Sequence, residues 1–146
     1  ECNLKCLDIR RKIGNPDDIS GSINNIGETY LEMGNMSEAE KWFNDCIKYP
    51  GATQDSIAWA YHNLGKVYFQ RQNFADAIQM FELSMEISKS IDYKILTTET
   101  LLVLCELHKT ALNYDMASIM GNEALKIAEQ IGAKEESKRI SFQRKY

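Results

Sequence analysis

Apolar residues recur along this chain at intervals of three and four positions, and no stretch sustains an alternation of apolar and polar residues. One such stripe runs from Ile19 through Ile23 and Ile26 to Tyr30. This spacing gathers side chains on one face of an α-helix, so the pattern predicts an all-α chain. The expected helices span residues 1–13, 16–33, 37–48, 54–71, 75–91, 94–111, 115–130 and 134–145.

The breaks between these segments carry residues that start and stop helices. Ser37 stands three residues before a glutamate, which is the spacing of a capping box, and is expected to open the second helix of its repeat. Gly34-Asn35 tolerates the left-handed backbone of a tight turn. At the two equivalent corners, asparagine is expected to supply that backbone at Asn73 and Asn113.

One pattern of apolar, small and aromatic residues occurs three times. The clearest copy has Tyr61, Leu64-Gly65, Tyr68, Ala77 and Phe81. The copy 38 residues earlier has Ile23, Ile26-Gly27, Tyr30, Ala39 and Phe43. A weaker copy 40 residues later has Leu101, Leu104-Cys105, His108 and Ala117. Repetition at this period is typical of units that bury their apolar faces by stacking on one another, which predicts a solenoid.

These copies resemble the tetratricopeptide repeat, whose pattern of Leu-Gly, Tyr, Ala and Phe has similar intervals. The third copy departs from it, with Cys105 in the glycine position, His108 in the tyrosine position and Gly121 in place of an aromatic residue. This departure predicts looser packing in that copy or a place near the end of an array. The resemblance implies an all-α fold, a right-handed superhelical solenoid of antiparallel helix pairs.

The resemblance covers almost the whole chain, as one array. The expected parts are the second helix of a truncated unit at 1–13, units at 16–53 and 54–93, a degenerate unit at 94–133, and the first helix of a truncated unit at 134–146. Units of 38 to 40 residues exceed the usual length of about 34. They are similar to the long-unit variants in bacterial peptide-pheromone receptors, Rap-type phosphatases and cell-polarity adaptors. Both ends fall inside expected helices, so we interpret the chain as excised from a longer protein.

The composition favours an intracellular, cytoplasmic domain. Of the 146 residues, 44% are hydrophobic and only two are proline, which argues against disorder. No apolar run approaches the roughly 18 residues that cross a bilayer, and no signal peptide is evident. The net charge is −4 and no basic stripe is present, so neither a nucleic acid nor a membrane is an expected partner.

Residues that could carry out chemistry are few and scattered. His62 and His108 are the only histidines and stand at different positions of their units, and the carboxylates form no acid–base pair in an apolar pocket. Cys6, Cys46 and Cys105 take positions that small residues hold in other copies, so we interpret them as packing residues. We therefore expect no catalytic residue, no metal, no cofactor and no enzyme activity in this segment.

Recognition is expected on the concave side, which the first helices of successive units line in solenoids of this kind. The predicted contact residues are Asn25, Glu28, Trp59, His62, Asn63, Lys66, Phe69, Gln70 and Glu106. Gly21 and Asn24 occupy further groove positions in the first unit. Trp59 and Phe69 are interpreted either as solvent-facing anchors beside His62 and Lys66, or as residues that lie under a neighbouring helix.

Asn25 and Asn63 each stand two residues before the repeat's glycine. An asparagine side chain can donate and accept together, as a peptide main chain requires. In family members that bind peptides, asparagine at this place often contacts the ligand, so the resemblance implies that role here. A hydrogen bond to the adjoining helix is the equally open alternative. A carboxylate clamp is not expected, because Glu28 and Glu106 oppose Lys66.

The sequence therefore predicts an interaction scaffold that binds a peptide or a partner-protein segment in the concave groove. The alternative is a peptide-sensing regulatory module, of a bacterial pheromone-receptor or Rap-type signalling protein, that controls an effector domain outside this segment. A third interpretation is self-association through the ends of the array.

Overall fold

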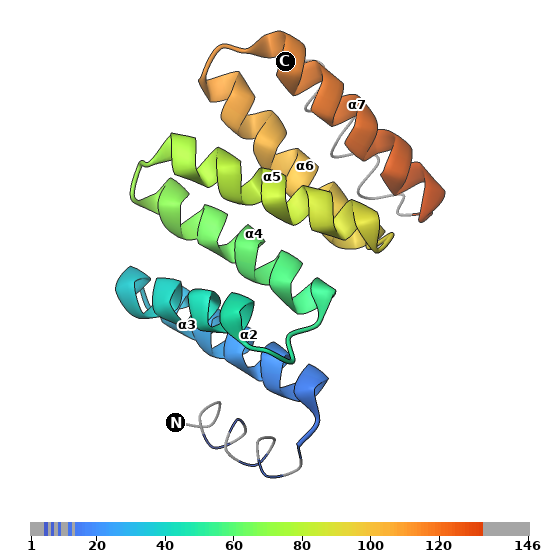
Figure 1. Ribbon diagram of the computed structural model, residues 1–146. Coiled ribbons are helices and arrows are strands. Elements are labelled where there is room, and N and C mark those ends of the chain that lie inside the picture. The colour runs from blue at the N-terminus through green and yellow to red at the C-terminus, as the bar shows by residue number, and fades with distance from the viewer. Residues whose placement is uncertain (1–4, 6, 8, 10–11, 13, 133–146) are drawn as a thin grey trace. The chain divides into compact units, whose positions relative to one another are not determined.

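The computed structural model describes residues 14–132 together with Lys5, Leu7, Ile9 and Lys12, which are helical (Figure 1). Within residues 14–132 there are six α-helices and no strand. They are α2 (Pro16–Glu32), α3 (Met36–Lys48), α4 (Gln54–Gln70), α5 (Phe74–Ser90), α6 (Lys94–Thr110) and α7 (Tyr114–Gln130). Each begins and ends within one residue of the predicted helix, so the all-α prediction is confirmed. Apart from these four residues, the expected helix at 1–13 lies outside the described residues, and so does the expected helix at 134–145.

The chain divides into two compact units, Glu1–Ile87 and Ser88–Tyr146. The first contains α2, α3, α4 and most of α5, and the second contains the end of α5 with α6 and α7. In the first unit α2 packs along α3, and α4 contacts both of them (Figure 1). In the second unit α6 packs along α7.

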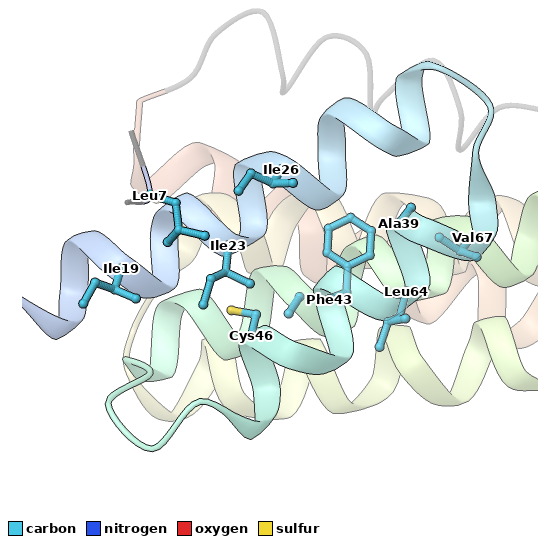
Figure 2. Packing of buried hydrophobic residues seen from close by; sticks show 10 residues of the cluster. Leu7, Ile19, Ile23, Ile26, Ala39, Phe43, Cys46, Leu64 and Val67 are labelled. Atoms are coloured by element: carbon cyan, nitrogen blue, oxygen red, sulfur yellow. The ribbon is translucent and has the colours of Figure 1, made fainter. Parts of the chain in front are cut away.

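The apolar stripe of α2 forms the core of the first unit with the inner faces of α3 and α4. Figure 2 shows Ile23 and Ile26 of α2 beside Phe43 and Cys46 of α3, all buried. Burial, with a smaller contribution from the charge of Asp55, raises the pKa of the Cys46 thiol to about 12. Cys46 therefore packs as a small apolar residue, as expected from its place in the repeat. Cys6 lies outside the described residues.

In each of the first two repeats, a glycine on the first helix faces a phenylalanine on the second. A Cβ atom built at Gly27 would lie 2.5 Å from Cε1 of Phe43, and one built at Gly65 would lie 2.7 Å from Cε1 of Phe81. Both phenylalanine side chains are fully buried. The helices come this close only because glycine has no side chain, so packing, not a turn, requires glycine at these two positions.

The third repeat has neither the glycine nor the phenylalanine of this contact. Cys105 of α6 takes the glycine position and Gly121 of α7 takes the phenylalanine position, and both are buried. The Cys105 thiol donates a hydrogen bond to the Ala117 carbonyl at 3.2 Å, and the Gly121 backbone hydrogen-bonds its sulfur. Leu104 beside them is fully buried. Cys105 and Gly121 are therefore both buried without the glycine–phenylalanine contact of the other repeats, and looser packing here stays a prediction.

Asn73 and Asn113 do not have the left-handed backbone that was predicted for them. The left-handed backbone belongs to the preceding residues, Gln72 with φ 62° and Leu112 with φ 59°. The Asn73 N–H then donates to the Tyr68 carbonyl at 2.9 Å. This is the closing bond of a Schellman motif, which requires positive φ at the residue before the donor. The prediction is therefore wrong by one position.

The asparagines cap the following helices instead. The Asn35 side-chain oxygen accepts a hydrogen bond from the Glu38 N–H at 3.3 Å, so α3 begins one residue before Ser37. Asn113 caps α7 in the same way. The prediction that Ser37 opens this helix is wrong. Ser37 lies in the first turn, whereas an N-cap residue precedes the first helical residue, and Asn35 holds that place.

We expect Gly65→Ala to lower the free energy of unfolding by about 1–3 kcal/mol, because the added methyl group displaces the fully buried Phe81 ring. Gly21→Ala is the matched control. Gly21 is also helical, but a Cβ atom there meets nothing within 4 Å. Alanine should therefore add up to about 1 kcal/mol through helix propensity. Urea denaturation measures both variants, and effects of equal sign would contradict the Gly65–Phe81 contact.

Candidate functional site: a cleft between two first helices

Buried polar side chains join α2 to the start of α4. The Ser20 hydroxyl donates to the Ser56 hydroxyl at 3.0 Å, and the Asn24 side-chain N–H donates to the Ser56 carbonyl at 2.8 Å. The Cys46 thiol of α3 donates to the Ser20 carbonyl at 3.5 Å. Breaking a hydrogen bond between buried groups is costly when it leaves them without another partner. They set the distance and register between α2 and α4.

A cleft of about 330 Å³ lies beside this network, between α2 and α4. We call it the α2–α4 cleft. Its lining residues are Gly21, Asn24, Asn25 and Glu28 from α2, and Asp55, Ser56 and Trp59 from α4. Gly21 helps to keep it open, because no atom fills the space where its side chain would stand. The cleft belongs entirely to the first unit.

Trp59 is held at the cleft by a row of aromatic rings. Its ring lies edge to face with His62, with centroids 5.6 Å apart, and His62 lies edge to face with Phe81 at 5.3 Å. Such pairs favour one orientation of each ring. Trp59 is half-buried, so neither of the two interpretations describes it fully: part of the indole is covered and part lines the cleft.

The helix position of His62 predicted a side chain that faces the groove, but the side chain is buried. Its side chain is 1% exposed because it fills the space between Trp59 and Phe81 of α5. Burial, with a smaller contribution from the charge of Lys66, lowers the pKa of His62 to about 3. The ring is therefore neutral near pH 7 and presents no charge to a partner.

Asn63 is 1% exposed and both ends of its side chain have partners. Its N–H donates to Glu28 of α2 at 2.9 Å, and its oxygen accepts from the Lys66 ammonium at 3.3 Å. Of the two open interpretations, the structure shows the hydrogen bond to the adjoining helix. Asn63 thus positions the Glu28 carboxylate at the cleft, and its own amide is not presented to a ligand main chain.

The remaining predicted contact residues lie in three different places. Asn25 is exposed and lines the α2–α4 cleft. Phe69 and Gln70, at the end of α4, are exposed but are not among the lining residues. Phe69 is 45% exposed and packs edge to face on Phe74 of α5 at 5.7 Å, so a neighbouring helix covers it only in part. Glu106 belongs to the second unit and is exposed.

Two lining residues, Asp55 and Ser56, were not among the predicted groove positions. A signal for Asp55 was available, because it stands four residues before Trp59 and therefore on the same helical face. Ser56 gave no such signal. Its importance depends on its contacts with Ser20 and Asn24, which lie 36 and 32 positions away in the chain.

The described residues, 14–132 with Lys5, Leu7, Ile9 and Lys12, contain no cluster of metal ligands and no membrane-spanning helix. Within that part of the chain, no group of three or more histidine, cysteine, aspartate or glutamate side chains is placed to hold a metal ion. None of its helices is long and apolar enough to cross a membrane.

Comparisons with known proteins agree with the fold. Two family models, both described as tetratricopeptide repeat, match residues 20–52 and 56–130. No curated protein matches. A similar solved structure is BtubC (BKLC) from P. vanneervenii, with 16% identity and a TM-score of 0.68 over 95% of this chain and 75% of that one. Another is the N-terminal domain of stress-induced protein-1 (STI-1) from C. elegans, with 16% identity and a TM-score of 0.67 over 86% and 94%. At this identity they show the fold, an all-α solenoid.

We expect His62 to make the folded state less stable in mild acid. The unfolded chain binds the His62 proton near its ordinary pKa of 6.5, whereas the folded chain has a pKa of about 3 for this group. Its contribution to stability is therefore complete above pH 6.5 and is lost as the pH falls towards 3. The free energy of unfolding should fall by up to about 1.4 kcal/mol per pH unit in this window from His62 alone.

His62→Phe isolates this effect, because phenylalanine keeps a ring beside Phe81 but cannot bind a proton. Urea denaturation at several values between pH 6.5 and pH 4 should give a shallower loss of stability for the variant than for the parent protein. Parallel curves would show that His62 is not buried in its neutral form.

Proposed function

The chain belongs to the tetratricopeptide repeat family, whose repeats are protein–protein interaction modules, and we propose that it binds a peptide or partner-protein segment in the α2–α4 cleft. The observation that carries this proposal is that three residues predicted as contacts, Asn25, Glu28 and Trp59, line one cleft. They come from two successive first helices, the elements that repeat solenoids use for recognition.

Trp59 is the anchor of the proposed site. Aromatic side chains dominate binding energy at interfaces, and they do so at low entropic cost when they are already held in place. The edge-to-face contacts that join Trp59 through His62 to Phe81 supply this restraint before any ligand binds. A partner would therefore cover the open part of the indole without first having to order it.

Asn25 and Glu28 are proposed to fix the position of the bound segment. Asn25 is exposed at the cleft, so its amide can donate to and accept from a ligand main chain. The Glu28 carboxylate is held by Asn63 at 2.9 Å, which limits the directions from which it can accept a further hydrogen bond. Together the two residues select a donor-bearing segment over a purely apolar one.

We also propose that the segment acts as a cytoplasmic scaffold without catalysis, in one array with repeats at 16–53, 54–93 and 94–133. Cys46 and Cys105 are free, buried thiols, which fits a reducing compartment. Burial raises the pKa of both thiols, which disfavours the reactive thiolate. His62 is covered and neutral, so it is a poor proton carrier for a substrate in the cleft.

Selection of peptides from a random display library against the whole chain tests this function. We expect selected peptides to bind with micromolar dissociation constants, and Trp59→Ala to weaken binding at least about tenfold, because it removes the anchor. Phe69→Ala is the control, since Phe69 is an exposed aromatic residue of the same helix outside the cleft, and it should change affinity by less than about twofold.

Binding is measured by isothermal calorimetry, with circular dichroism to verify that each variant keeps its helix content. Failure to select any peptide, or selected peptides that bind the Trp59→Ala variant as tightly as the parent protein, would refute the proposed function.

A further inference from the structure

One residue that lines the α2–α4 cleft, Asn24, has a buried acceptor without a partner. Asn24 is 5% exposed, and its N–H group donates to the Ser56 carbonyl at 2.8 Å. That bond fixes the orientation of the amide, because a carbonyl can only accept. The Asn24 side-chain oxygen is then directed elsewhere, is buried, and has no hydrogen-bond partner. An unsatisfied buried acceptor is costly, and a ligand donor that reached it from the adjoining cleft would remove that cost.

Two carboxylates share this lining. Glu28 uses one oxygen to accept from Asn63, and its other oxygen can accept from a ligand. Asp55 lies in the first turn of α4 and is exposed. No lysine, arginine or histidine is among the seven lining residues, so the lining carries two negative charges and no positive one. The nearby Lys66 is bonded to the Asn63 oxygen.

The third feature of the cleft is the indole of Trp59. An aromatic face attracts a cation, and a flat guanidinium ion stacks on it better than a compact ammonium ion. A guanidinium group also offers five donors in one plane, enough to reach several acceptors at once. A metal ion would use the carboxylates but not the indole, and no metal-binding group of side chains occurs among the described residues.

We propose that the α2–α4 cleft binds an arginine side chain of the partner segment. Its guanidinium group donates to the Asn24 oxygen and to the carboxylates of Glu28 and Asp55, and its plane lies against Trp59. The inference rests on the proposed function and specifies it. Arginine is preferred to lysine because the acceptors come from two helices and the cleft has an aromatic wall, both of which suit a planar group with many donors.

A titration followed by nuclear magnetic resonance tests this directly on the whole ¹⁵N-labelled chain. The probes are the N-acetyl methylamides of arginine, citrulline and lysine. Citrulline has nearly the shape of arginine without its charge. We expect arginine to shift the side-chain signals of Asn24 and Trp59 in a saturable way, with a millimolar dissociation constant. Lysine should bind at least about threefold more weakly, and citrulline should produce no saturable shift.

Two variants assign the effect to the carboxylates. Glu28→Gln retains an oxygen to accept from Asn63, and Asp55→Asn retains the shape of its side chain, so both should keep a dispersed amide spectrum. Each should weaken arginine binding about threefold to tenfold, because each replaces a charge-assisted hydrogen bond by a neutral one. Raising the salt concentration should weaken arginine binding to the parent chain.

Several results would overturn the proposal. These are the absence of a saturable shift at Asn24 and Trp59, equal binding of citrulline and arginine, equal or tighter binding of lysine, or unchanged affinity in both variants. The outcome is separable from that of the peptide selection. Selected peptides that depend on Trp59 but contain no arginine would leave the proposed function standing and refute this inference.

Discussion

The close approach between a glycine on one helix and a phenylalanine on the next sets the spacing on which the rest of the first unit depends. Gly27 faces Phe43, and Gly65 faces Phe81, at distances that no other residue could accept without a shift. Because one face of each first helix is committed to this contact, its remaining polar positions are directed elsewhere. Ser20 and Asn24 of α2 then meet the start of α4, and the space left beside them is the α2–α4 cleft.

The polar residues around the cleft differ in whether their side chains already have hydrogen-bond partners within the chain. Asn63 is fully used, since it bridges Glu28 and Lys66 and is covered. Still available are the amide oxygen of Asn24 and carboxylate oxygens of two lining residues, Glu28 of α2 and Asp55 of α4. A site with leftover acceptors and an aromatic wall is selective by chemistry, because a ligand without donors would leave those acceptors desolvated and unpaired. The proposed preference for arginine follows from this imbalance.

The sequence was sufficient for the helices and for five of the seven residues that line the cleft. Spacings of three and four, superposed across three copies, placed the six described helices within one residue, and the repeat predicted that Cys46 packs as a small buried residue. The errors arise where a residue's position depends on a partner distant in the chain. His62 occupies a groove position in its own helix, yet α5 covers it through Phe81. Gln72 is left-handed because a Schellman bond requires it, whatever the residue type. The orientation of the Asn24 amide depends on its hydrogen bond to Ser56, which lies 32 positions away and which no local sequence pattern predicts.

The central claim is that a partner segment lies in the α2–α4 cleft, and a crystal structure of the whole chain with a display-selected peptide tests it most directly. The account predicts electron density for the peptide along the cleft, in contact with Trp59 and Glu28 and within hydrogen-bonding distance of the Asn24 side-chain oxygen. A peptide bound instead on the exposed Phe69–Phe74 pair, or on the second unit, with the cleft unfilled, would contradict the account.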